Sequence, residues 1–136
     1  TNYNILVLDQ TLKNSSSISF INTSVLRGGT DYDANVTAGL WDFYDKKNTW
    51  NFSGKFAVSQ LYGYEAPGKT TLGTEHSVNF SKTGGRLNFN LWQELASDKY
   101  EQNDMGYFTN NNYLEIQIEK NYTYIVTKVH KISKTR

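Results

Sequence analysis

Hydrophobic and polar residues alternate with a period of two along much of the chain. Such alternation predicts β-strands with one apolar and one polar face. The pattern is clearest from Trp50 to Ser59, and it recurs from Arg86 to Leu91 and from Leu114 to Glu119. The apolar positions of these stretches are Trp50, Phe52, Phe56, Val58, Leu87, Phe89, Leu91, Leu114, Ile116 and Ile118. Helical i, i+3, i+4 spacing is nowhere sustained, so the expected fold class is all-β.

Five further stretches have strand length, and their alternation varies. The third along the chain carries Ala34, Val36, Ala38 and Leu40 on one parity, and the fifth carries Leu72, Val78 and Phe80, interrupted by Thr74 and His76. The first two, Tyr3 to Leu12 and Ser17 to Arg27, alternate poorly. An eighth follows Lys120. The sequence therefore predicts about eight strands.

The connections between these stretches alternate in length. Short breaks are expected at residues 13–16, 45–48, 81–85 and 120–121, and longer ones at 27–33, 63–70 and 96–112. If each connection is a hairpin, the strands form an antiparallel up-and-down meander with all short turns at one end. Outer-membrane β-barrels have this asymmetry. The fold predicted is such a meander, forming all or part of an outer-membrane β-barrel.

Aromatic residues gather near both ends of the predicted strands. Near the short turns lie Phe43, Tyr44, Trp50, Phe52, Phe80, Phe89, Tyr122 and Tyr124. Near the long connections lie Tyr32, Tyr62, Tyr64, Trp92, Tyr100, Tyr107, Phe108 and Tyr113. Two aromatic girdles are typical of membrane-spanning barrels, although aromatic residues also close the ends of ordinary β-sandwiches.

Two opposite assignments of the strand faces fit this periodicity. In a membrane barrel the ten apolar positions given first would face lipid. The lumen would then receive the polar positions Asn51, Ser53, Lys55, Asn88, Asn90, Glu115 and Gln117. In a soluble β-sandwich or lipocalin-like barrel the apolar positions would face inward instead. Period alone does not separate the two.

Composition narrows the classes of protein. The chain has 136 residues, which suits a single domain over residues 1–136, and its formal net charge of +1 argues against a nucleic-acid partner. It contains no cysteine, and its aromatic content is 15% with one proline, Pro67. No run approaches the ~20 apolar residues of a transmembrane helix. This composition suits a β-sheet protein without disulfide or thiolate chemistry.

Two regions of the sequence carry a resemblance to a known family. The first is Asn22-Thr23-Ser24-Val25-Leu26-Arg27 with the following Tyr32-Asp33-Ala34-Asn35-Val36-Thr37, and the second runs from Ser97 to Asn112, with Lys46-Lys47-Asn48-Thr49 between them. Together they resemble the C-terminal barrel region of bacterial outer-membrane proteins that carry an N-terminal carbohydrate-binding-like domain. The resemblance covers roughly Leu12 to Tyr124. The chain is far shorter than such a barrel and lacks that N-terminal domain.

The number of predicted strands bears on whether the chain forms a complete barrel. Eight strands counted from the first short turn would place both ends of the chain on the long-loop side. A complete small barrel normally has both ends on the short-turn side. We therefore expect a run of hairpins from a larger barrel, or one chain of a split barrel, unless the count is wrong by one at each end.

One candidate ligand site is a platform of aromatic and polar side chains near the long connections. Aromatic rings stack on the apolar faces of sugars, while amides and carboxylates bind hydroxyl groups. The candidate residues are Tyr62, Tyr64, Trp92, Tyr100, Glu101, Asn103, Asp104 and Tyr107. The same aromatic residues would otherwise simply form the outer girdle.

Catalytic and metal chemistry have little support in the sequence. The two histidines, His76 and His130, have no partner at metal-ligand spacing. Asp98, Glu101 and Asp104 supply oxygen atoms that suit calcium, but their spacing does not match an EF-hand loop. No nucleophile elbow, phosphate loop or catalytic triad order is present. We expect no catalytic residues, no metal and no cofactor.

The function expected is that of an outer-membrane β-barrel component in a diderm bacterium. Its role would be passage or surface recognition, with glycans as candidate ligands that the resemblance suggests. The expected partners are outer-membrane lipid, further barrel strands or other envelope chains, and a glycan, but no nucleic acid. The alternative is a soluble secreted or periplasmic β-sandwich or lipocalin-like barrel that binds a carbohydrate or small ligand.

Overall fold

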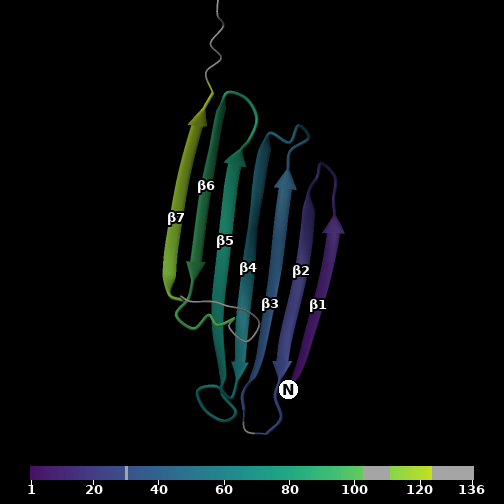
Figure 1. Cartoon of the computed structure of the whole chain (residues 1–136), viewed down its shortest axis with the longest axis vertical. Coiled ribbons are helices and arrows are strands. Elements are labelled where there is room, and N and C mark those ends of the chain that lie inside the picture. The colour runs from purple at the N-terminus through teal and green to yellow at the C-terminus, as the bar shows by residue number, and fades with distance from the viewer. Residues whose placement is uncertain (30, 103–110, 124–136) are drawn as a thin grey trace, which may run out of the picture.

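Seven antiparallel strands form one sheet in the computed structural model, which describes residues 1–29, 31–102 and 111–123. The strands pair strictly in chain order, and no helix occurs among the described residues (Figure 1). Their bounds are β1 Asn2–Thr11, β2 Ser17–Leu26, β3 Asp33–Tyr44, β4 Trp50–Tyr62, β5 Thr70–Lys82, β6 Leu87–Ala96 and β7 Tyr113–Tyr122. The predicted all-β antiparallel meander is confirmed. Within the described residues β1 pairs only with β2 and β7 only with β6, so the sheet is open.

The connections alternate as the sequence predicts. Residues 12–16, 45–49 and 83–86 make the short turns, whereas residues 27–32, 63–69 and 97–112 make the longer connections. Figure 1 shows the short turns at one end of the sheet and the longer connections, with the N-terminus, at the other. Below, these are the short-turn end and the long-loop end.

Local chemistry explains the tight turns. Asn14 and Ser15 both have positive φ angles, 59° and 58°, between the hydrogen-bonded Lys13 and Ser16, which is the geometry of a type I′ hairpin turn. In the next hairpin the Asp45 carboxylate accepts the backbone N–H groups of Thr49 and Trp50. The hydrogen bond from the Trp50 backbone N–H stabilises the carboxylate and contributes most to lowering the pKa of Asp45.

Two predicted boundaries were wrong. The break expected at Lys120 and Asn121 lies inside β7, where both residues pair with β6. Residues 81 and 82 still belong to β5, so that turn begins at Thr83. Polar residues are tolerated here because strand ends are exposed, and the ladder continues through them. The predicted eighth stretch begins at the last residues of β7 and otherwise lies outside the described residues.

The register assigns every strand residue to one of two faces. We call the side that carries Phe56 the open face and the side that carries Lys55 the covered face, because the segment from Ser97 to Gln102 lies over the latter. All ten apolar positions singled out in the sequence share the open face. All seven polar positions proposed for a lumen share the covered face.

The two faces exchange character along β2 and β3. Toward the short-turn end the open face carries apolar residues such as Phe20 and Trp41, as it does on β4 to β7. Toward the long-loop end the open face of these strands is polar instead, with hydrogen bonds joining Asn22, Asn35 and Thr37. The apolar parity seen in the third stretch, from Ala34 to Leu40, therefore lies on the covered face.

Two small clusters of buried residues lie at the long-loop end of the covered face. One consists of Val25, Ala34 and Leu61, with Tyr32 packed against it. The other contains Ala57, Ala96 and Tyr100, flanked by Ala38 and Tyr113. Many large apolar side chains are exposed, most of them on the open face or on the edge strands, including Ile118 at 74%. The described residues contain no helix long and apolar enough to cross a membrane.

Candidate functional site

A short segment from Ser97 to Gln102 folds back over the covered face. In Figure 1 this segment, the green trace that follows β6, runs from the end of β6 toward β5 and β4. Ser97 fixes its start, since its N–H donates to the Thr74 carbonyl and its Oγ accepts the Thr74 N–H, each at 2.9 Å. Farther along, the Glu101 N–H donates to Ser59 Oγ at 3.0 Å. These bonds hold the segment across two strands.

Small residues on β4 and β5 make room for this segment. Gly73 lies opposite Ser59 in the register, and next to them Ala57 is also buried. A Cβ atom added to Gly73 would stand 2.2 Å from the Lys99 carbonyl oxygen. Only glycine therefore allows the segment to lie this close to β5.

Tyr100 covers a buried ion pair. Lys55 Nζ lies 2.6 Å from Glu75 Oε1, and the Glu75 side chain is only 2% exposed while that of Lys55 is 33% exposed. Tyr100 is 1% exposed, and its hydroxyl donates to Gln102 Oε1 at 3.0 Å. Burial, with a smaller contribution from Glu75, raises the pKa of Tyr100 above its ordinary value.

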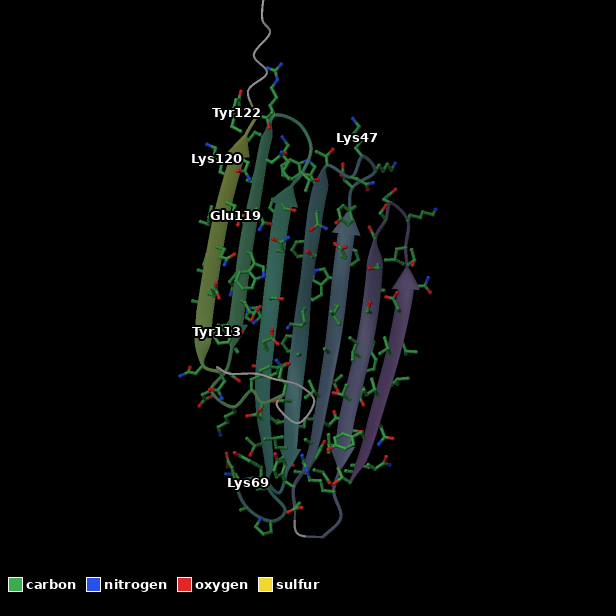
Figure 2. The ribbon with its side chains drawn as sticks, viewed as in Figure 1. Lys47, Lys69, Tyr113, Glu119, Lys120 and Tyr122 are labelled. Atoms are coloured by element: carbon green, nitrogen blue, oxygen red, sulfur yellow. The ribbon has the colours of Figure 1, made fainter. Side chains whose placement is uncertain are left out.

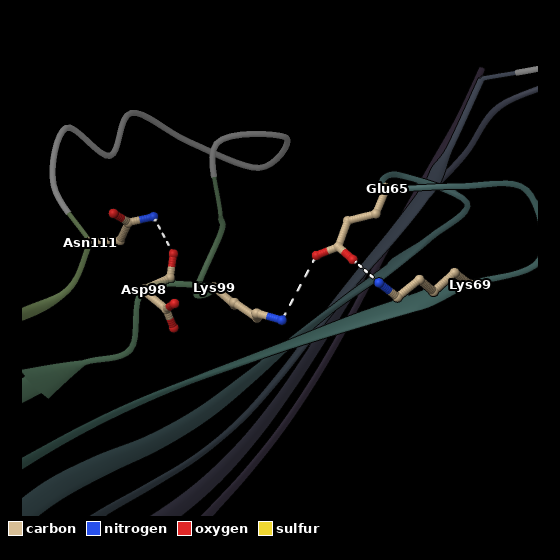
Figure 3. A network of polar contacts seen from close by, with 5 residues as sticks. All are labelled: Glu65, Lys69, Asp98, Lys99 and Asn111. Carbon is tan, nitrogen blue, oxygen red and sulfur yellow. Dashed lines mark hydrogen bonds and ion pairs between the residues drawn. The ribbon is translucent and has the colours of Figure 1, made fainter.

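Polar contacts tie the segment to neighbouring loops. Lys99 Nζ lies 3.8 Å from Glu65 Oε1 in the connection after β4, and Glu65 also pairs with Lys69 (Figure 3). The hydrogen bond from the Lys69 ammonium contributes most to lowering the pKa of the Glu65 carboxyl group. On the other side of the segment, the Asn111 side-chain amide donates to the Asp98 carbonyl at 2.9 Å.

A second polar region surrounds Trp92, nearer the short-turn end of the covered face. Trp92 pairs with Asn79 on β5 and with Gln117 on β7. Two shallow hollows of about 440 and 390 Å³ meet there, because Trp92 and Asn79 line both. The other polar residues of the hollows include Asp42, Ser53, Lys55, Ser77, Asn90 and Gln117.

The predicted aromatic platform is not assembled by the described residues. Tyr62 lies on the open face, and Tyr64 packs edge-on against Tyr32 in the long connections. Tyr100 is buried between the segment that carries it and the sheet. Trp92 lies elsewhere, between the two hollows described above, which we call the Trp92 hollows. Glu101 follows Tyr100 in the segment and is half-buried. Asn103, Asp104 and Tyr107 lie outside the described residues.

The predicted girdle at the long-loop end needs a similar correction. Trp92 and Tyr113 lie on the covered face and Tyr100 lies in the segment over it, so none belongs to an outer ring. Tyr44, predicted for the short-turn girdle, also lies on the covered face. The girdle prediction used only closeness to the connections. Strand parity already groups Trp92 with Asn90, and Tyr113 with Glu115, on the polar side. Tyr107, Phe108 and Tyr124 lie outside the described residues.

Histidine and acidic residues form no metal site in the described part of the chain. His76 lies on the open face with Nε2 3.3 Å from the Gln93 side-chain nitrogen, and no group of three metal-ligating residues occurs there. Of the residues considered for calcium, Asp98 and Glu101 lie in the described segment, whereas Asp104 and also His130 lie outside the described residues. Sequence reasoning missed the Lys55–Glu75 pair, because each residue alone reads as an ordinary lumen or solvent position.

Comparison with known proteins gives a family but no activity. The family described as "Domain of unknown function (DUF5916)" matches residues 1–135. The chain belongs to this family. No curated protein and no solved structure matches it. Membership in the DUF5916 family carries no information about membrane location or carbohydrate binding, so those parts of the predicted resemblance stay predictions.

Proposed function

We propose that the chain forms wall strands of an outer-membrane β-barrel in a diderm bacterium, with a role in passage or surface recognition. One observation carries this proposal: large apolar side chains are exposed on the open face, whereas Asn51, Ser59 and Glu75 are buried on the covered face. A lipid-facing exterior around a polar lumen has this arrangement. An aqueous surface would leave the same apolar side chains solvated.

The dimensions of the apolar band support the proposal. On β4 it runs from Trp50 to Val58, with Gly54 between. Eight steps of ~3.3 Å give about 26 Å along the strand before tilt shortens the height. The apolar band of outer-membrane barrels is ~25 Å tall. The polar open-face cluster of Asn22, Asn35 and Thr37 lies at the long-loop border of the band, because Thr37 pairs with Val58 and Asn35 pairs with Gln60. Strands that leave the membrane there would meet water.

Aromatic and basic residues at the short-turn end fit a headgroup region. Trp50, Phe80 and Phe89 form a cluster with ring centroids 5.5 to 5.9 Å apart. The Lys82 ammonium lies 5.8 Å from the centre of the Trp50 ring. Lys47, Lys120 and Tyr122 lie toward the same end (Figure 2). Rings and long cationic side chains prefer this interfacial level.

The sheet edges imply partners under this proposal. Unpaired backbone groups cost several kcal/mol each in hydrocarbon. Further barrel strands must therefore pair with β1 and β7, either from other parts of the same protein or from other envelope chains. Lipid is the partner of the open face. We propose a binding or transport role without catalysis.

The alternative is a soluble secreted or periplasmic protein with a ligand site. It requires the open face to be buried against a second layer, and none occurs in the described part of the chain. A direct discriminating observation is detergent dependence of the purified chain, together with a mobility shift on boiling in a gel. A folded monomer in plain buffer would end the membrane proposal.

Tryptophan quenching by brominated lipid tests the assignment of faces. Trp50 lies on the open face and Trp92 on the covered face. In vesicles, a chain with Trp50 alone (W41F/W92F) is expected to be quenched strongly by lipid brominated in its acyl chains. A matched chain with Trp92 alone (W41F/W50F) is expected to be quenched little. Equal quenching of both, or quenching of Trp92 only, contradicts the proposal.

A further inference from the structure

The covered face holds a lone indole among amide side chains. Of the three tryptophans, Trp41 and Trp50 lie on the open face, and Trp92 alone lies on the covered face. The residues directly across from Trp92 are Asn79 and Gln117, and Asn90 lies two positions before it on β6. This arrangement places an apolar ring between hydrogen-bonding groups from three adjacent strands.

The hollows beside Trp92 form a continuous path across the strands. Polar residues make up most of its lining, together with Leu40, Trp41 and Gly54 toward β3. Asn90 and Gln117 line the hollow toward β7, while Ser53 and Ser77 line the hollow toward β3. Because Trp92 and Asn79 belong to both, the hollows meet at the indole. Their volumes of about 440 and 390 Å³ lie within the ~300–1,000 Å³ range of small-molecule sites. A ligand with repeating units could occupy both.

The polar groups of the path suit hydroxyl groups. Asn79 donates weakly to Ser53 Oγ at 3.5 Å, and its Oδ1 has no hydrogen-bond partner among the described residues. Amide side chains both donate and accept, which matches sugar hydroxyls. An indole offers a large apolar surface for the C–H face of a pyranose ring.

Charge in the path favours a neutral ligand. Lys55, the cation that lines it, is already paired with Glu75 at 2.6 Å. Asp42 lines the hollow toward β3 and accepts from the Asn51 amide. Glu115 and Glu119 flank Gln117 on the same face of β7. Carboxylates in this number would repel phosphate or uronic acid groups but accept hydroxyl donors.

We infer that the Trp92 hollows bind a neutral oligosaccharide, with its chain crossing the strands and one ring stacked on Trp92. The inference rests on the proposed function only for placing this site inside a lumen; the site itself requires only the covered face. It moves the predicted glycan contact away from the long-loop end, where Tyr100 is buried. Trp92 supplies the stacking surface, and Asn79, Asn90 and Gln117 supply hydrogen bonds.

Calorimetric titration of the folded chain with maltohexaose, cellohexaose and xylohexaose tests this inference. We expect saturable binding of at least one of them. Trp92→Ala should weaken it by about tenfold or more, as loss of a stacking ring does, and Gln117→Ala should weaken it less. Trp50→Ala, a matched substitution on the open face, should leave the affinity unchanged.

Two results would overturn the inference: absence of saturable binding to all three sugars, or binding that Trp92→Ala leaves intact. Preferential binding of a charged probe, such as hexagalacturonate, would also overturn it. These failures are distinct from failure of the barrel proposal. If the chain needs detergent but binds no sugar, the barrel proposal stands and the sugar site is ruled out. If the chain folds in plain buffer and binds sugar through Trp92, the sugar site stands and the barrel proposal is ruled out.

Discussion

The backbone of Tyr100 lies against Gly73, with the Tyr100 Cα 2.3 Å from the point where a Cβ on Gly73 would stand. Any side chain at Gly73 must therefore displace the segment from Ser97 to Gln102. We predict that Gly73→Ala costs about 1–3 kcal/mol of unfolding free energy, as overpacking does. Urea unfolding measures the loss. Tryptic cleavage after Lys99 should also become faster, because the segment no longer packs against β5.

Gly39 provides a matched control for that substitution. It lies within β3, and a Cβ added there would meet nothing within 4 Å. Gly39→Ala should therefore leave stability unchanged or raise it slightly, because alanine restricts the unfolded chain more than glycine. Equal effects of the two substitutions on stability would mean that the segment does not pack closely against Gly73.

The Lys55–Glu75 pair predicts an asymmetric double-mutant cycle. Glu75 is almost fully buried while Lys55 is one-third exposed. Lys55→Met leaves an unpaired buried carboxylate and should cost about 3–5 kcal/mol. Glu75→Gln leaves an ammonium that water still reaches, so its cost should be smaller. The double variant should be more stable than Lys55→Met alone.

Urea unfolding of the four proteins measures this cycle. Lys69→Met serves as control, because the Lys69–Glu65 pair is exposed in a loop and should contribute little. Additive effects of the two substitutions at Lys55 and Glu75 would rule out an energetic coupling between them.

Much of the fold could be predicted because it depends on local patterns. Loop lengths can be read directly from the sequence. Turn residues such as Asn14 and Asn48, which adopt positive φ, can be recognised from their immediate sequence neighbours. Alternation on β4, β6 and β7 assigned their residues to faces correctly relative to one another. These strands keep one polarity over most of their length, so period two was sufficient there.

The candidate site could not be predicted because it depends on register between strands. Glu75 comes near Lys55 only because β5 pairs with β4 so that Glu75 lies opposite Ala57. Tyr100 reaches Gly73 through a loop with no periodic pattern. On β2 and β3 the faces exchange polarity midway, which weakens alternation in sequence. The nearest signal in the sequence is the presence of small residues within strands, Ala57 and Ser59 on β4 and Gly73 on β5.

Burial of Tyr100 predicts an alkaline transition. Its pKa is raised in the folded chain, so the phenol stays protonated above the ordinary tyrosine pKa of ~10. The stability linked to this group is therefore fully present below pH ~10 and is lost as the pH rises toward the folded pKa. Wild type should lose stability in this range more steeply than Tyr100→Phe.

Unfolding free energies at pH 9, 10 and 11 measure this difference. Absorbance at 295 nm gives a second reading, because tyrosinate absorbs there. Subtracting the Tyr100→Phe titration from that of wild type should remove the other tyrosines and show no ionisation near pH 10. An ordinary titration in the difference curve would contradict burial of Tyr100 in solution.

The exposed residue Ile116 separates a lipid face from a water face. It lies on the open face of β7, midway between Leu114 and Ile118, and is 63% exposed. In a bilayer Ile116→Arg should cost about 2–4 kcal/mol, because the guanidinium must enter hydrocarbon. On an aqueous surface the same substitution should change stability by only about 0.5 kcal/mol. Asn4→Arg is the control, since Asn4 is exposed on the open face of β1 beyond the apolar band. Unfolding in vesicles should thus show a large loss for Ile116→Arg and little for Asn4→Arg, whereas equally small losses would mean that water covers the open face.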